Sequence, residues 1–195
     1  MSFAQLIAEG ATIEAMAELL DGLDHDGRVQ AIRAVGGKSQ KALWQRAEGH
    51  VAQMHDIVPP DVPPLTPVRH FGKNSLPLFS HFEKRFCRPA EDADVWWGYN
   101  HQPNAWITGP GYFFCKASEA AERGAVVVDY HHVPPAGAPL PEGWPAPKPN
   151  DKGLSRPVYG FMEDYLRRVS AHVTIGRAWR HGKATGNYFI LCRES

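Results

Sequence analysis

The sequence predicts an α+β fold, in which an N-terminal cluster of short helices is followed by a mainly antiparallel β-sheet with one amphipathic helix packed on it. Three observations predict this class: helical spacing of apolar residues up to about residue 49, a proline-rich break after it, and strand-like stretches from residue 93 onward. The chain has 195 residues, of which 43% are apolar and 22% charged. These values are typical of one globular domain, or of one domain with a small appendage.

Residues 3–49 carry the helical signal. Apolar residues recur at helical spacing from Ile13 to Leu23, with Thr12 placed to cap the N-terminus of that helix. Asp24 or Asp26 could cap the next helix, and Ser39 a further one. Helices this short are marginal alone, so we expect them to pack on one another or on the remainder of the chain.

A proline-rich segment separates this helical part from the rest. Residues 57–67 contain five prolines, which favour extended backbone and cannot continue a helix. The predicted organisation is therefore a helical N-terminal segment over residues 1–56, a connector over 57–67, and an antiparallel α+β domain over 68–195.

The central part of the chain changes from a helical to a strand pattern. Apolar spacing over residues 75–86 predicts one more short helix. Aromatic and β-branched residues over 95–100 and 105–108 then flank a turn and predict a hairpin, and further strands are expected over 112–115 and 125–130.

The C-terminal part predicts the amphipathic helix and the last two strands. Apolar residues between Val158 and Val169 recur at helical spacing, which predicts a helix over 157–169. Strands near 171–180 and 187–193 are joined by a glycine-containing connection, which favours an antiparallel hairpin. About five strands are expected in total.

A second proline-rich segment lies between the predicted strand at 125–130 and the helix at 157–169. Residues 134–149 contain seven prolines and predict a long connection without regular structure. Three interpretations remain open: an ordered cover whose Trp144 docks on the sheet, a mobile lid, or an extended peptide that another domain recognises.

Composition restricts the compartment and the partners. The formal net charge is zero, which argues against binding of bulk nucleic acid or of an anionic membrane surface. The three cysteines show no metal-ligand spacing and are expected to be free thiols in a reducing compartment. The N-terminus shows no signal-peptide pattern and the chain no membrane-length apolar run, so we expect a cytoplasmic protein.

An aromatic cluster over residues 96–114 is the first candidate site. Because neighbouring strand residues point to opposite faces, this stretch presents aromatic side chains on both faces of the sheet. One face would build the core, and the other would be covered, line a pocket or meet a partner, which includes a second copy of the chain. The predicted ligand-binding residues are Trp97, Tyr99, Trp106 and Tyr112.

The histidines form the second candidate site. A site could be assembled from His101, His131 or His132, and His172, which all lie at predicted strand ends or turns. Asp129 is placed to orient the His131 imidazole and raise its basicity. His131 and His132 are adjacent, so only one of them would join a given site unless the backbone bends there. The histidine spacing is not that of a metal site, so neither a metal nor another cofactor is expected. Solvent-exposed turn histidines without a joint role are the alternative.

Two classes of function remain open from the sequence. The first is a small-molecule-binding protein, which could be a metal-free acid/base enzyme of the isomerase, cyclase, lyase or hydrolase type with an aromatic pocket. The second is a non-catalytic interaction or assembly module that uses the aromatic face and the proline-rich segment. The sequence selects neither, and no known family is recognised in it.

Overall fold

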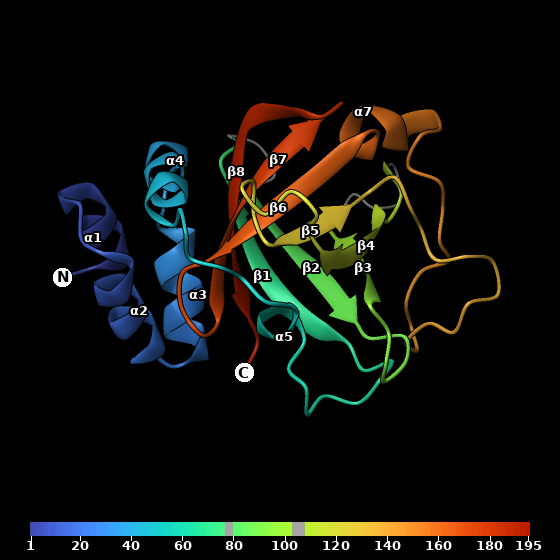
Figure 1. Ribbon diagram of the computed structural model, residues 1–195, viewed down its shortest axis with the longest axis horizontal. Coiled ribbons are helices and arrows are strands. Elements are labelled where there is room, and N and C mark those ends of the chain that lie inside the picture. The colour runs from blue at the N-terminus through green and yellow to red at the C-terminus, as the bar shows by residue number, and fades with distance from the viewer. Residues whose placement is uncertain (77–79, 103–107) are drawn as a thin grey trace.

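The protein is a closed antiparallel β-barrel with a layer of helices on one side, as a computed structural model of residues 1–76, 80–102 and 108–195 describes it (Figure 1). Eight strands in the described residues follow one another around the barrel in sequence order. They are β1 (Val68–Asn74), β2 (His81–Cys87), β3 (Val95–His101), β4 (Tyr112–Ala117), β5 (Val126–Asp129), β6 (Met162–Arg168), β7 (Val173–Arg180) and β8 (Lys183–Arg193).

Pairing of the first strand with the last closes the barrel. Phe71 of β1 lies opposite Cys192 of β8, and both strands continue in register on either side of that pair. All the other neighbours pair antiparallel as well, with an irregularity between Arg177 and Trp179 of β7. A closed barrel leaves no unpaired sheet edge, which removes the risk of edge-to-edge association.

Alternation along the strands gives the barrel an inside and an outside. Phe86, Phe113 and Leu166 are fully buried and belong to one apolar cluster, which lies in the lumen. Tyr165 and Ile175, on the opposite faces of their strands, belong to a second cluster together with the helices. The chain therefore builds two cores, one within the barrel and one between the barrel and the helical layer.

Three inward-facing glycines make room for aromatic rings in the lumen. A Cβ atom at Gly72 would overlap the ring of Phe82, and one at Gly98 the ring of Phe113. A Cβ atom at Gly176 would likewise overlap the ring of Phe189. Glycine in the interior of a strand costs stability by itself, and here its role is to admit a close packing partner.

The helical layer covers the outer face of β1, β7 and β8 (Figure 1). Its helices are α1 (Phe3–Glu9), α2 (Ile13–Asp21), α3 (His25–Arg33) and α4 (Gly37–Arg46), and α5 (Met54–Ile57) follows them. Thr12 and Asp24 accept hydrogen bonds from backbone N–H groups as N-caps of α2 and α3, as the sequence predicts. The N-cap of α4 is Gly36 and not Ser39. Trp44 of α4 packs against Trp179 of β7, with 5.9 Å between ring centroids.

The predicted α+β fold class is wrong, because the sheet closes into a barrel. Antiparallel pairing is confirmed, but the strands form an eight-stranded closed barrel and not an α+β sheet of about five strands with a packed helix. The expected strands at 171–180 and 187–193 correspond to β7 and β8. Closure depends on pairing between β1 and β8, which lie far apart in the sequence, and apolar periodicity carries no information about such a pairing.

The amphipathic helix expected over 157–169 is the clearest local error. Only a 3-10 turn, η1 (Gly153–Ser155), and a single helical turn, α7 (Arg156–Tyr159), precede strand β6. Both faces of β6 are buried: Leu166 points into the lumen, whereas Tyr165 packs on Trp179 of the helix-covered face. When both faces of a strand are buried, its apolar residues can fall at helical spacing, which explains the wrong prediction.

The helix expected over 75–86 is also wrong. Residues 81–87 form β2, in which Phe82, Lys84 and Phe86 point inward. Residues 77–79 lie outside the described part of the chain. The first strand of the hairpin expected over 95–108 is β3. Residues 103–107, which include Trp106, also lie outside the described part of the chain.

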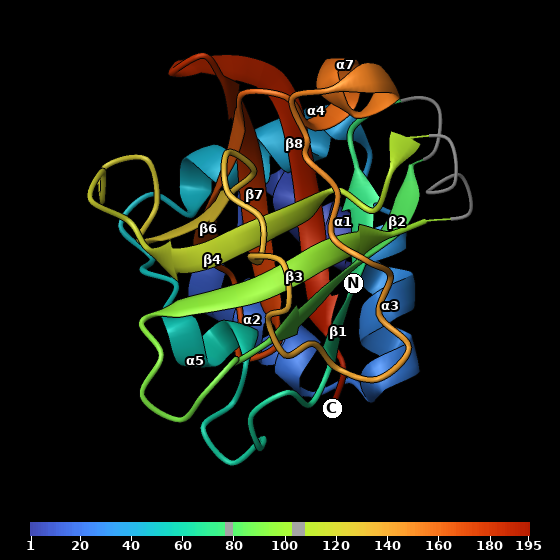
Figure 2. The same ribbon diagram turned by 90° about the vertical axis from the view of Figure 1, so that its right-hand side faces the viewer.

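The second proline-rich segment crosses the outer face of β3 and β4 (Figure 2). Trp144 packs on Tyr99 and Tyr112, with ring centroids 5.0 Å and 6.2 Å apart. The Tyr112 hydroxyl donates to the Pro145 carbonyl over 2.6 Å, and the Asn150 side chain donates to the carbonyls of Tyr112 and Tyr130. Of the three interpretations of this segment, the contacts match the ordered cover with a docked Trp144.

Candidate functional site

A cavity of about 340 Å³ lies inside the barrel, at the end where α7 and the β7–β8 turn are found. Apolar side chains such as Phe82, Met162 and Phe189 line much of it, and Ala178 leaves room in its wall. The volume is at the lower end of the ~300–1,000 Å³ range of small-molecule sites. The other end of the lumen is filled by Val68, Phe86 and Leu166 among others, so the space is confined to one half of the barrel.

A buried polar group lies beside this cavity. Lys84 of β2 forms an ion pair with Asp164 of β6, with 3.1 Å between Nζ and Oδ2. Lys84 Nζ also donates to Asn100 Oδ1 over 3.1 Å and to the Tyr130 hydroxyl, and the Asn100 amide donates to the same hydroxyl over 3.0 Å. All four residues line the cavity. We call Lys84, Asn100, Tyr130 and Asp164 the polar centre.

The ion pair of the polar centre joins opposite walls of the barrel. Strands β2 and β6 are four places apart in a ring of eight, so the Lys84 and Asp164 side chains meet across the lumen. Their exposed side-chain fractions are 3% and 5%, which places both charges out of contact with bulk water. Removing charges from water is costly unless they are paired and hydrogen-bonded, and the polar centre supplies both.

Aromatic rings enclose the ammonium group of Lys84. Its Nζ lies 4.9 Å from the ring centroid of Tyr130, 5.0 Å from that of Phe113 and 5.3 Å from that of Phe189. A cation within about 6 Å of an aromatic face is attracted by the ring quadrupole. The inward glycines Gly98 and Gly176 are what allow the rings of Phe113 and Phe189 to lie there.

Burial acts on the two charges of the polar centre in opposite directions. It lowers the pKa of Lys84 and raises the pKa of Asp164, and in each case the charge of the partner offsets part of the effect. Burial also raises the pKa of the Tyr130 hydroxyl well above its usual value, which keeps that hydroxyl protonated. The polar centre therefore consists of hydrogen-bonding groups that the walls of the barrel hold in fixed positions.

One acceptor in the polar centre is not used by the protein. Asp164 Oδ1 is buried and has no hydrogen-bond partner among the described residues, whereas Oδ2 accepts from Lys84 and lies 3.3 Å from the Tyr130 hydroxyl. A buried carboxylate oxygen without a donor is energetically unfavourable. Asp164 lines the cavity and Oδ1 is covered by neighbouring atoms, so a donor on a bound molecule would reach this atom after the carboxylate rotates.

The ligand-binding residues expected from the sequence lie elsewhere. Trp97, Tyr99 and Tyr112 are on the outer face of β3 and β4, where Trp144 packs on the two tyrosines, and none of them lines the cavity. Trp106 belongs to the residues that are not described. Among the described residues, the aromatic side chains that line the cavity are Phe82, Tyr130, Tyr159, Tyr188 and Phe189.

The acid/base candidates at the end of β5 share one carboxylate. Asp129 accepts from the Nδ1 atoms of His131 and His132, both over 2.9 Å, and from the His131 backbone N–H over 2.8 Å. The chain leaves the strand after Asp129, so the adjacent histidines no longer point to opposite faces. Burial raises the pKa of Asp129, but these hydrogen bonds outweigh it and hold the pKa below its usual value. With Nδ1–H donating, each neutral imidazole carries its free lone pair on Nε2.

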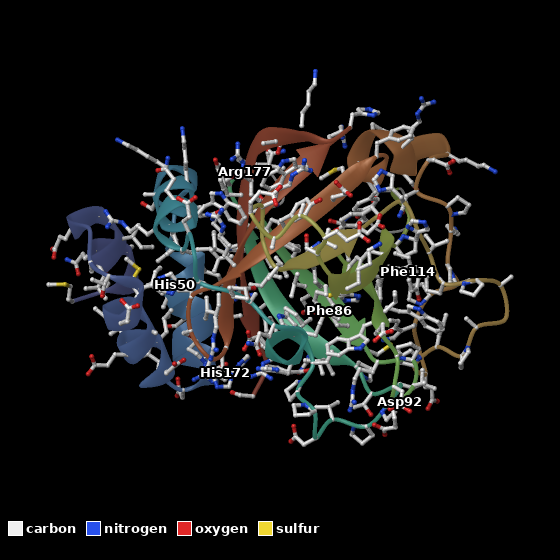
Figure 3. All side chains as sticks on the ribbon, in the orientation of Figure 1. His50, Phe86, Asp92, Phe114, His172 and Arg177 are labelled. Atoms are coloured by element: carbon white, nitrogen blue, oxygen red, sulfur yellow. The ribbon has the colours of Figure 1, made fainter. Side chains whose placement is uncertain are left out.

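His101 belongs to a different environment. Its Nδ1 lies 3.4 Å from the Tyr99 hydroxyl, and the nearby charges are those of Arg85 and Glu83. His172 lies near the C-terminus and beside Arg193, far from Phe114, whose ring stacks on His132 (Figure 3). The contacts bring His131 and His132 together on Asp129, and they do not include His101 or His172.

Metal-ligand clusters and membrane-length helices also bear on function. Among residues 1–76, 80–102 and 108–195, no group of three or more His, Cys, Asp or Glu side chains is arranged to hold a metal ion. Within the same residues, no helix has the length and apolar character needed to cross a membrane.

Comparison with protein-family models, with curated proteins and with solved structures found no match. The geometry of the chain is therefore the basis for inferring its function. A β-barrel with buried aromatic clusters is compatible with a small-molecule-binding protein.

Sequence reasoning missed the polar centre, although a signal for it exists. Lys84 alternates with Phe82 and Phe86 in β2, and Asp164 alternates with Met162 and Leu166 in β6. Interpreted as strands, these segments would place one lysine and one aspartate on otherwise apolar faces, where a charge needs a partner. Interpreted as helices, the same charges fall on solvent-facing positions.

Proposed function

We propose that this protein binds a small, largely apolar molecule in the barrel cavity, and that the molecule carries a hydroxyl or N–H group that donates a hydrogen bond to Asp164. The observation that carries the proposal is the coincidence of the cavity with the buried polar centre. An apolar pocket with a few fixed polar groups is the usual form of a small-molecule site.

The unpaired acceptor supports a ligand that donates a hydrogen bond. The donors of Lys84 are directed at Asp164, Asn100 and Tyr130, so a ligand carboxylate would compete with an existing ion pair. Asp164 Oδ1, in contrast, lacks a donor among the described residues. An alcohol, phenol or amide N–H satisfies that atom without adding a charge to the lumen.

A matched pair of probes tests this assignment. Binding of 4-propylphenol and of 4-propylanisole, which lacks the donor, would be measured by isothermal titration calorimetry. We expect the phenol to bind about tenfold more tightly, since a hydrogen bond to a charged group contributes about 1.5–3 kcal/mol. Equal affinity for the two probes would contradict the role of Asp164, and binding of neither would contradict the cavity site.

Ala178→Leu supplies the matched variant, because Ala178 lines the cavity and is 3% exposed. The added carbons would occupy the space of the ligand and abolish phenol binding. Ala136→Leu makes the same chemical change on an exposed residue of the proline-rich segment and should leave binding unchanged. Circular dichroism of both variants verifies that the barrel is folded.

Acid/base catalysis at the outer face is a second candidate function, favoured by the carboxylate of Asp129 holding two imidazoles. His131 also borders a pocket of about 210 Å³ with Asp151 and Phe161. In such a site Asp129 would orient His131, whose Nε2 would take the proton of an attacking water. Hydrolysis of 4-nitrophenyl acetate should fall in His131→Ala and not in His55→Ala, an exposed histidine elsewhere; equal rates would remove this candidate.

A further inference from the structure

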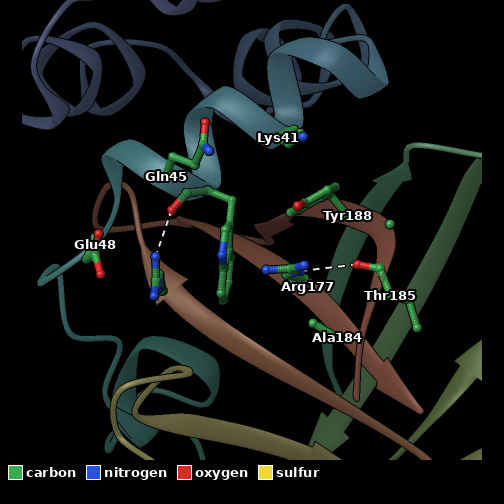
Figure 4. Close-up of a pocket in the computed structure, with 10 residues that line it drawn as sticks. Lys41, Gln45, Glu48, Arg177, Ala184, Thr185 and Tyr188 are labelled. Carbon is green, nitrogen blue, oxygen red and sulfur yellow. Dashed lines mark hydrogen bonds between the residues drawn. The ribbon is translucent and has the colours of Figure 1, made fainter.

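A second pocket, separate from the barrel cavity, lies on the outside between α4 and the β7–β8 hairpin (Figure 4). We call it the outer groove; its volume is about 670 Å³. Its lining residues come from α4, β6, β7 and β8: Lys41, Trp44, Gln45, Glu48, Arg167, Arg177, Ala184, Thr185, Gly186 and Tyr188.

Positive charge is concentrated in the outer groove. Lys41, Arg167 and Arg177 line it, against the single carboxylate of Glu48. In the described part of the chain, no carboxylate lies within ion-pair distance of any of these three cations. The whole chain has a formal net charge of zero, so this local excess is a property of the groove and not of the protein surface at large.

Arg177 is held with the end of its side chain available. Its guanidinium lies 5.1 Å from the ring centroid of Trp179 and 5.4 Å from that of Tyr188, and its Nε donates to the Thr185 carbonyl over 3.2 Å. Figure 4 shows this side chain between Tyr188 and Ala184, facing the groove. Its two terminal nitrogens form no hydrogen bond with the described residues. Those nitrogens can bind two oxygens of one anionic group in the planar, bidentate manner of guanidinium.

Arg167 supplies a second fixed charge. Its guanidinium lies 4.1 Å from the ring centroid of Trp44, and it donates to the carbonyls of Trp44 and Glu122. Burial lowers the pKa of Arg167, and the charge of Arg177 lowers it further, although Glu48 opposes this. Two guanidinium groups that repel each other are stabilised when an anion lies between them.

From this geometry we infer that the outer groove binds a small molecule carrying an oxyanion, either a phosphate or a carboxylate. The bidentate end of Arg177 holds the anionic group, Arg167 adds charge, and Lys41 contributes from the opposite wall on α4. This inference is independent of the barrel cavity and of its ligand.

A small molecule fits the groove better than a nucleic-acid strand. A strand of phosphates needs an extended basic track, whereas only three cations line this groove and Glu48 lies among them. An oligonucleotide is retained in the experiment below as the competing occupant.

The test measures binding of phenyl phosphate, benzoate and uncharged benzyl alcohol to the intact chain by calorimetry and by NMR of the arginine Nε–H signals. We expect at least one of the two anions to bind and to shift the Arg177 signal, and benzyl alcohol not to bind. The anion that binds more tightly identifies the phosphate or the carboxylate as the recognised group. Added salt should weaken the binding, because the interaction is between charges at the surface.

Variants locate the site. Arg177→Gln should weaken anion binding by about tenfold or more, since it removes a charged hydrogen-bonding group. Lys41→Gln should weaken it by about two- to fivefold, as expected for an exposed charge. Lys38→Gln is the matched control: it removes the same charge from α4, one turn away and outside the groove, and should leave binding unchanged.

Any one of three results with the small probes would overturn the inference. They are no binding of either anion, equal binding to wild type and to Arg177→Gln, and binding of benzyl alcohol as tight as that of the anions. Tighter binding of a single-stranded oligonucleotide than of phenyl phosphate, lost in Arg177→Gln, would assign the groove to nucleic acid and overturn the small-molecule occupant. If Arg177→Gln fails to fold, Lys41→Gln measured against Lys38→Gln decides the matter.

Discussion

The inner and outer faces of strands β3 to β5 both carry aromatic clusters, but the two faces are completed in different ways. On the outer face, Trp144 of the same chain packs on Tyr99 and Tyr112. On the inner face, the rings surround the Lys84 ammonium beside a cavity that no described side chain fills. An aromatic cluster indicates a binding site only when the chain does not itself supply the packing partner, and that condition holds for the inner face.

Breaking the inner ion pair should have the largest effect. Asp164→Asn leaves Lys84 buried without a counter-charge and should lower the free energy of unfolding by about 3–5 kcal/mol, measured by urea denaturation. Replacing both partners, as in Lys84→Met with Asp164→Leu, should recover much of that loss.

The outer face offers the matched comparison for that ion pair. Lys116 Nζ lies 3.6 Å from Asp129 Oδ2, and the lysine side chain is 40% exposed. Lys116→Met should therefore lower the free energy of unfolding by about 1 kcal/mol or less. If Asp164→Asn and Lys116→Met lowered the free energy of unfolding by similar amounts, the ion pair between Lys84 and Asp164 would not be shielded from water.

Acid should destabilise the lumen through His70, which is 1% exposed and donates from Nε2 to the Ile57 carbonyl. Burial lowers the pKa of His70 to about 3. The unfolded chain therefore binds the proton first, so stability present at neutral pH is lost as the pH falls from the unfolded value of about 6.5 toward 3.

Proton binding by His70 in the unfolded chain should lower the free energy of unfolding by about 3 kcal/mol between about pH 7 and pH 4.5, measured by denaturation at each pH. His70→Gln removes the titrating group, so its stability should fall by correspondingly less over that range. The same pH dependence in the variant and in wild type would show that His70 is not the cause.

A methyl group on an inward glycine should cost about 1–3 kcal/mol. In Gly98→Ala the new Cβ would overlap the ring of Phe113 and the Arg85 carbonyl, so ring or strand must move. Gly186→Ala, also in a strand but with no atom within 4 Å of its Cβ position, is the control and should leave the midpoint of thermal unfolding nearly unchanged. A midpoint for Gly98→Ala equal to that of the control would indicate a looser lumen.

The smallest effect should follow from removing the outer packing partner. Trp144→Ala exposes Tyr99 and Tyr112 and should cost about 1–2 kcal/mol, since the indole is only partly buried. It should leave binding of 4-propylphenol unchanged, because the cavity lies on the other side of the sheet. Loss of phenol binding in this variant would transfer the site to the outer face.

The local signals in the sequence predicted part of the fold. N-caps at Thr12 and Asp24 and the hairpin of β7 and β8 follow from residue types and short spacings. Strand β6 was missed because Leu166 and Tyr165 are buried against different partners, which produces a helical spacing of apolar residues. Closure of the barrel depends on the pairing of β1 with β8, which no local pattern encodes.

The candidate sites were predictable to different degrees. The link between Asp129 and His131 is visible in the sequence because two residues along a strand end are close in space, and the structure places these side chains 2.9 Å apart. Their catalytic role remains a prediction. The polar centre joins Lys84 to Asp164, 80 positions away, and only the closed barrel brings them together.

We propose that the ligand binds inside the barrel and not under Trp144. Intermolecular nuclear Overhauser effects between bound 4-propylphenol and the protein test it most directly, because Met162 and Ala178 line the cavity and carry methyl groups. We expect effects from the propyl and ring protons to these two methyl groups, and none to the Trp144 indole. Effects to Trp144, without any to Met162 or Ala178, would contradict it.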